Sequence, residues 1–190
     1  METEQTLSPQ QSLELISSVI SKTKDNIKAN SFLFILWGWL ISVASISFFI
    51  LNRFTDFKYF FLPFPVLAIV GITVSLRYYI MQKRSTTETH LSYFLYRMWL
   101  VLGICFITVV FINVSQNLIP VTYTLLVAGI GTLISGLVLK FNPLIFGGVL
   151  FLLSVVLSIY IPNEYRMLFH GVIIIAGYLI PGYLLKYSKS

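Results

Sequence analysis

The chain has 190 residues, of which 57% are hydrophobic and only 11% are charged, and its formal net charge is +6. Soluble domains carry roughly 25% charged residues, so the 13 basic and 7 acidic side chains of this chain could not cover its apolar surface in water. The mean hydropathy of +0.86 therefore argues against an ordinary soluble domain and predicts a protein whose solvent is the lipid bilayer.

The first 30 residues are predicted to form a cytoplasmic amphipathic helix. Ser8 with Gln11 makes a capping-box pattern, and Pro9 suits the first helical position. The apolar positions on one helical face are Leu13, Ile16, Val19, Ile20 and Ile27. This helix could pack on the membrane bundle, lie on lipid or bind a partner protein, and the shortness of the apolar stripe favours the bundle or the lipid surface.

Six segments are apolar and long enough to cross a bilayer, which takes about 20 residues as a helix. They are solidly apolar rather than alternating, and this favours helices over the strands of a β-barrel. The predicted spans are residues 31–51, 60–80, 98–115, 121–139, 144–160 and 168–186. The sequence thus predicts an all-α, polytopic integral membrane protein, with the cytoplasmic helix in residues 1–30 and a six-helix transmembrane bundle in residues 31–187.

The third helix is expected to begin well before its span. Ser85 and Glu88 form a second capping-box pattern, and no proline or glycine follows until Gly103. The helix should therefore start near Thr86, outside the bilayer. Its exposed beginning would give the amino-terminal helix an apolar surface to contact.

Lys140 decides whether residues 121–161 form one buried segment or two. Forty-one residues are about twice the length of one span, and a lysine at the centre of a membrane helix costs about 3 kcal/mol. Asn142 is a good N-cap, Pro143 suits the first helical position, and Lys140 would lie in the last turn of the preceding helix, where a cation is favoured. The sequence therefore predicts a tight helical hairpin with Lys140 at its turn.

Small residues recur in the fourth and fifth spans at helical spacing. They are Ala128, Thr132, Gly136, Gly147 and Gly148. Small residues let membrane helices approach closely, and no ring of polar groups accompanies these, so close packing is favoured over a glycine-lined pore. Pro181 should kink or end the sixth helix. No internal sequence repeat is evident.

Four polar residues are candidates for a site at the outer end of the bundle. They are Asp56, Glu164, Arg166 and His170. Such side chains could ligate a metal or relay protons, but charged groups are ordinary at the headgroup level, which favours a solvated role. The common catalytic signatures are absent, and no predicted span holds an acidic residue, so we expect no catalytic, cofactor-binding or metal site.

The basic residues predict the orientation of the bundle. All 13 lysines and arginines lie outside or at the ends of the spans, ten on one side of the six-span arrangement and three on the other. Loops on the cytoplasmic side of a membrane are enriched in Lys and Arg, so both termini are expected in the cytoplasm. Topology thus accounts for the positive charge, and no nucleic-acid partner is implied.

Four short motifs carry a resemblance. These are "QSLELISSVISKTK", "LWGW" from Leu36 to Trp39, "KFNPLIFGG" from Lys140 to Gly148, and "IPGYLLK" from Ile180 to Lys186. With them the chain resembles a family of small, uncharacterised bacterial multi-pass membrane proteins. The resemblance implies a helical protein of the bacterial inner membrane, and it implies no activity, cofactor or functional residue.

The expected function is that of a non-enzymatic accessory or regulatory membrane protein. Its partners would be the lipid bilayer and a protein bound at the cytoplasmic amino-terminal helix, and the sequence indicates no oligomeric state. A small-solute transporter or channel subunit is the alternative. The absence of acidic residues within the spans weighs against a transporter or channel. An intramembrane or lipid-modifying enzyme is a third possibility, and the absence of paired polar residues within one leaflet weighs against it.

Overall fold

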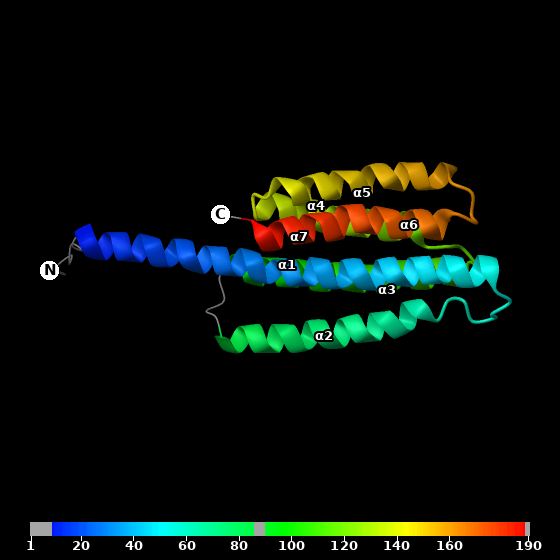
Figure 1. The fold of residues 1–190 in the computed structure, drawn as a ribbon, viewed down its shortest axis with the longest axis horizontal. Coiled ribbons are helices and arrows are strands. Elements are labelled where there is room, and N and C mark those ends of the chain that lie inside the picture. The colour runs from blue at the N-terminus through cyan, green and yellow to red at the C-terminus, as the bar shows by residue number, and fades with distance from the viewer. Residues whose placement is uncertain (1–8, 86–89, 189–190) are drawn as a thin grey trace.

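The computed structural model describes the backbone of residues 9–85 and 90–188, and the side chains of residues 31–81 and 91–188. Every regular element within these ranges is helical. The elements are α1 (Pro9–Phe54), α2 (Pro63–Ser85), α3 (His90–Ser115), α4 (Val121–Val138), α5 (Asn142–Tyr160), α6 (Arg166–Ile174), the π-helical segment η1 (Ile175–Leu179) and α7 (Ile180–Tyr187). The helices lie roughly side by side in one elongated bundle (Figure 1).

Six helical segments among the described residues are long and apolar enough to cross a membrane. They are Ser31–Phe54, Pro63–Met81, Leu91–Ser115, Val121–Val138, Asn142–Tyr160 and Arg166–Tyr187. The prediction of an all-helical chain with six such segments is therefore confirmed. The last segment counts as one because α6, η1 and α7 follow one another without a break.

The structure joins two elements that the sequence separates. Residues 9–30 and the first span form the single 46-residue helix α1. No proline lies between Pro9 and Pro63, so nothing interrupts the backbone hydrogen bonds where the bilayer segment begins. Figure 1 shows the amino-terminal part of α1 continuing straight past the ends of the neighbouring helices. The capping residue Ser8 lies outside the described residues.

Two helix starts differ from the prediction. The second helix begins at Pro63 rather than at residue 60, because Pro63 and Pro65 fit the first turn, where a missing N–H costs nothing. A turn closed by the Leu62 N–H and the Tyr59 carbonyl, 3.0 Å apart, precedes it. Helix α3 is described from His90. Its predicted start near Thr86 falls in residues 86–89, outside the described part of the chain.

The predicted hairpin at Lys140 is confirmed, with a correction of its caps. Helix α4 ends at Val138, and Lys140 follows the C-cap with a φ of 51°. The Phe141 N–H donates to the Gly136 carbonyl at 2.9 Å, and the Lys140 N–H donates to the Leu137 carbonyl at 3.2 Å. These two bonds form a Schellman motif, which satisfies the carbonyls left free at a helix end.

The prediction of Asn142 as N-cap was wrong by one residue. Phe141 holds that position in an extended conformation, and Asn142 and Pro143 occupy the first turn of α5. The Schellman motif causes the shift, because it uses Phe141 to close α4 and leaves no spare residue before α5 begins. The turn between α3 and α4 has the same left-handed residue after the helix end, with Asn117 at a φ of 56°.

Packing divides the bundle into a buried part and a peripheral part. Helices α4 and α5 form the most extensive pair, α1 packs against α2 and the α6–η1–α7 rod, and α3 packs against α4. In the apolar window of α4, 56% of the residues are buried, whereas in the windows of α2 and α3 only 6% are. Helices α2 and α3 therefore present most of their apolar surface outward, as helices facing lipid do.

Candidate functional site

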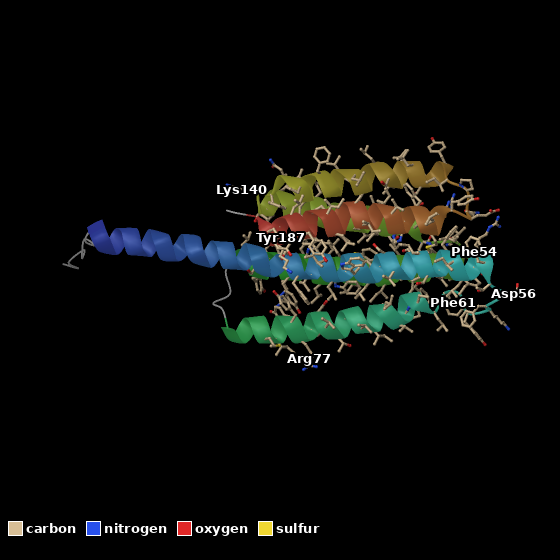
Figure 2. All side chains as sticks on the ribbon, viewed as in Figure 1. Phe54, Asp56, Phe61, Arg77, Lys140 and Tyr187 are labelled. Carbon is tan, nitrogen blue, oxygen red and sulfur yellow. The ribbon has the colours of Figure 1, made fainter. Side chains whose placement is uncertain are left out.

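The four residues of the predicted outer cluster do not form one site. Asp56 is exposed in the α1–α2 loop, at the end of the bundle that Figure 2 labels with Phe54 and Phe61. Glu164 is also exposed and faces Arg53 at 3.7 Å, where an ion pair in water contributes little. Arg166 donates from Nε to the Ile161 carbonyl at 3.0 Å, which satisfies a free carbonyl at the end of α5.

His170 does not lie with these three residues, because its side chain points into the bundle. Its side chain is buried, with 5% exposure, between helices α1, α4 and α6. Nδ1 lies 2.8 Å from the Ser45 hydroxyl, and Nε2 lies 3.4 Å from the Thr124 hydroxyl. Among the described residues, no group of three or more His, Cys, Asp and Glu side chains is placed to hold a metal ion.

The hydrogen bonds around His170 determine which ring nitrogen carries the proton. The Thr124 hydroxyl lies 2.9 Å from both the Pro120 and the Val121 carbonyls, so its hydrogen is engaged there and its oxygen accepts. We therefore assign the hydrogen to Nε2, which leaves Nδ1 to accept from the Ser45 hydroxyl. An ionisable residue inside a helical membrane bundle is a candidate functional group, and Ser45 is its closest partner.

The predicted small residues lie where helix backbones come closest. A methyl group at Gly136 would lie 2.5 Å from the Ile145 nitrogen, and one at Gly148 would lie 2.5 Å from the Leu133 nitrogen. Ala128 and Thr132 are fully buried on the same α4 face. Gly147 faces the other way, toward the α6–η1–α7 rod, where a methyl group would lie 2.6 Å from the Gly177 carbonyl oxygen.

The sixth helix continues through Pro181 by widening into the π-helical segment η1. Pro181 has no N–H to offer the Gly177 carbonyl, and its ring would clash with that carbonyl in an α-helix. The turn relaxes instead, and the Ile180 N–H donates to the Ile175 carbonyl, five residues back. The sixth helix therefore does not end at Pro181, as one of the two predicted outcomes had it, but continues to Tyr187 after a π-helical turn.

Tyr178 in η1 contacts side chains from several other helices of the bundle. The centroid of its ring lies 4.9 Å from that of Phe151 in α5, 5.9 Å from that of Phe34 in α1 and 6.4 Å from that of Trp99 in α3. Its hydroxyl makes a hydrogen bond with the Thr132 side chain of α4. Sequence reasoning missed this residue, because a tyrosine in a span is usually assigned to the membrane interface.

A second feature missed from the sequence is a contact that occurs twice. In the α1–α2 pair, the Trp37 Nε1–H donates to the Ser75 hydroxyl at 3.1 Å, while the Trp37 ring and Leu40 cover Gly71. In the α3–α4 pair, the Trp99 Nε1–H donates to the Ser135 hydroxyl at 3.0 Å.

The covered glycine recurs there as well, because Trp99 and Leu102 lie over Gly131. Each pair thus combines Trp-x-x-Leu on its first helix with Gly-x-x-x-Ser on its second. The only signal in the sequence is these two four- and five-residue patterns, and they are too short to stand out among membrane helices.

No protein-family model matches the chain, and comparisons with curated proteins and with solved structures found no match either. The resemblance to small bacterial membrane proteins therefore stays a prediction from the sequence.

Proposed function

We propose that this chain is a multi-pass protein of the bacterial inner membrane with both termini in the cytoplasm, and that it acts as a non-enzymatic accessory or regulatory protein. The six apolar helical segments support membrane insertion. The distribution of lysine and arginine, ten on one side and three on the other, supports the orientation. The resemblance to small bacterial membrane proteins supports the location.

The observation that carries the proposal is the length of α1. It has 46 residues, about twice what a bilayer requires. Its span begins at Ser31, so residues 9–30 form an arm about 33 Å long at 1.5 Å per residue. The arm continues straight beyond the bundle in Figure 1, which leaves its sides open to another molecule.

The arm is suited to a helix of a partner protein. Positions 13, 16, 20 and 27 are Leu or Ile, and in a helix their spacing of three, four and seven residues falls along one seam. This is the spacing of a coiled coil, in which each apolar side chain fits between residues of a facing helix. The opposite face carries Ser18, Lys22 and Asp25. We therefore infer an amphipathic helix of another protein as the occupant.

Photocrosslinking from the arm of the full chain tests this function. A crosslinking residue at Ile16 should give one defined protein adduct, and one at Ser18, on the opposite face, should not. Ile20→Asp should abolish the adduct, whereas Ala29→Asp, which adds the same charge away from the seam, should preserve it.

Two outcomes would refute the partner-binding function. Adducts that form equally from Ile16 and Ser18 would show a non-specific surface. Adducts from Ile16 to the chain's own bundle would show that the arm docks internally.

The second candidate is a small-solute transporter or channel subunit, and the observation that favours it is His170 among Ser45 and Thr124. Two cavities of the described bundle are lined by apolar side chains, which does not favour a polar passage. Proton flux in proteoliposomes that disappears in His170→Gln, with stability retained, would support this candidate. Equal proton flux in the wild type and in His170→Gln would exclude a role for His170 in transport.

A further inference from the structure

Helix α6 is a short element between a loop and a π-helical turn. It has nine residues, Arg166–Ile174, with the loop of residues 161–165 before it and η1 directly after it. A helix bends most readily at a π-helical turn or a proline, and the sixth helix has both, since Pro181 closely follows η1. Helix α6 is therefore the part of this helix that can turn about η1 while α7 stays in place.

The packing of α6 is less tight than the packing of η1. At η1 two backbones meet, because a methyl group at Gly147 of α5 would lie 2.6 Å from the Gly177 carbonyl oxygen. At α6 the nearest neighbour is a side chain, because a methyl group at Gly171 would lie 3.1 Å from Cγ1 of Ile46 in α1. A side chain can take another rotamer, whereas a packed backbone cannot move aside. Packing thus fixes η1 more firmly than it fixes α6.

His170 connects α6 to two other helices. Its Nδ1 accepts from the Ser45 hydroxyl of α1 at 2.8 Å, and its Nε2 lies 3.4 Å from the Thr124 hydroxyl of α4. The ring belongs to a residue only four positions, or about 6 Å, from the beginning of α6. A small rotation of α6 about η1 would therefore break both contacts and move the ring toward the water at the loop.

The surroundings of His170 offer nothing to balance a positive charge on its ring. Helices α4 and α5, which pack against α6, contain no charged residue, and the charged residue in the span of α1 is Arg53. Helix α6 itself contributes Arg166, another cation. The carboxylates among the described side chains, Asp56 and Glu164, are exposed in loops.

The tyrosines near α6 do not change this balance. A phenol has a pKa of about 10 and is therefore neutral between about pH 5 and 8. The tyrosines in the elements packed against α6 and in the loop before it are Tyr123, Tyr160, Tyr165 and Tyr178. The site of His170 is therefore suited to a neutral ring, because a buried charge without a partner is costly.

We propose that His170 is an acid-sensitive switch, whose protonation releases α6 from α1 and α4 and lets it turn about η1. A protonated ring carries a hydrogen on both nitrogens, so Nδ1 can no longer accept from the Ser45 hydroxyl. In the released position water solvates the charge. The closed form binds no proton on the ring, whereas the released form binds one below about pH 6.5, so release becomes more favourable as the pH falls. The inference goes beyond the proposed function and does not depend on the amino-terminal arm.

Thiol labelling of the purified full chain tests the switch in a Cys105→Ser background. Met167→Cys places a thiol at a buried position of α6, and Ala44→Cys places one at a buried position of α1 beside the small cavity between α1 and α2. The reagent is a dithiodipyridine, which reacts at acid and at neutral pH, and each rate is divided by that of the denatured chain at the same pH. The Met167→Cys rate should rise about tenfold between pH 7.5 and pH 5.5, because one proton is taken up on release. The Ala44→Cys rate should stay constant.

His170→Gln is the variant that removes the titration. Its side chain keeps one donor and one acceptor group but carries no charge at any pH. The Met167→Cys rate should therefore be equal at the two pH values in this variant. The other histidine of the chain, His90, remains in place, so a pH effect that belongs to His90 would persist.

Three results would overturn the proposal. A Met167→Cys rate that does not change with pH while His170 is present would show that acid does not release α6. An equal rise at Ala44→Cys would show that acid loosens the whole bundle. A rise that persists in His170→Gln would place the acid-sensitive group elsewhere. The first two results need no substitution at position 170, so they decide the matter even if His170→Gln does not fold.

Discussion

His170 lies in the bundle interior because three helices supply groups for its ring. Ser45 comes from α1, Thr124 from α4 and the histidine itself from α6, so the contact forms only when all three helices are in place. The sequence places His170 near the beginning of the sixth apolar segment, and the structure confirms that position in Arg166–Tyr187. The sequence does not reveal the direction of the side chain, because one helical residue of rotation separates a buried face from a lipid-facing one.

Ser45→Ala should destabilise the bundle by about 1–3 kcal/mol, because it leaves the buried Nδ1 of His170 without a donor. Thr108→Ala is the matched control. Its hydroxyl is exposed and bonds only the Ile104 carbonyl of its own helix at 3.0 Å, so its removal should change stability little. Thermal unfolding in detergent measures both, and equal effects would contradict the role of the Ser45–His170 bond.

Tyr178 should tolerate the loss of its hydroxyl far better than the loss of its ring. Tyr178→Phe gives up one hydrogen bond worth about 0.5–1.5 kcal/mol, and the cost should lie at the low end because Thr132 still bonds the Ala128 carbonyl at 2.7 Å. Tyr178→Ala removes a ring that touches three other helices and should cost about 3–5 kcal/mol. Comparable unfolding temperatures for the two variants would show that the ring contacts contribute little.

Helices α4 and α5 are held at a separation that only glycine allows. At Gly136 the neighbouring group is a backbone nitrogen of α5, which cannot move aside as a flexible side chain would. Glycine is a poor helix former in water, so its presence at this position is explained by the contact and not by propensity.

Gly136→Ala should therefore destabilise the protein by about 1–3 kcal/mol through overpacking. Gly103→Ala provides the opposite case, because a methyl group there meets nothing within 4 Å. That substitution should be neutral or stabilising by up to about 1 kcal/mol, as alanine is the better helix former. The pair is compared by thermal unfolding in the same detergent, and a loss of stability in both variants would contradict the close-approach account.

The elements differ in how much the sequence reveals about them. The turn at Lys140 is predictable because a charge, an Asn and a Pro coincide within four residues of an apolar stretch. The π-helical turn is predictable only in part. Pro181 indicates that the regular α-helix is interrupted, but it does not indicate whether the helix kinks, ends or widens into a π-helical turn. The two Trp–Ser contacts join residues 36 and 38 positions apart, and no local pattern connects positions on different helices.

At the scale of the whole molecule, length and hydropathy are enough to predict six helices, because each span must satisfy its own backbone. The arrangement of the six helices depends on how their side chains pack, and the sequence pattern does not predict that packing. The dispersal of Asp56, Glu164, Arg166 and His170 is the clearest case, since nearness to one end of the bundle says nothing about which way each points. The continuity of α1 is another, because the predicted boundary followed polarity and not the backbone.

The central claim is a six-span chain whose Lys140 hairpin lies on the same side as both termini. Single cysteines in a Cys105→Ser background test it most directly, with a thiol reagent that does not cross the membrane of intact cells. Asp56→Cys, Asn117→Cys and Asn163→Cys lie in three turns at one end and should all be labelled from outside. Asn142→Cys at the hairpin should be labelled only after the cells are broken open. Labelling of Asn142→Cys in intact cells, together with protection of Asn163→Cys, would contradict the proposed orientation. Labelling of both positions in intact cells would contradict the membrane crossing of α5 itself.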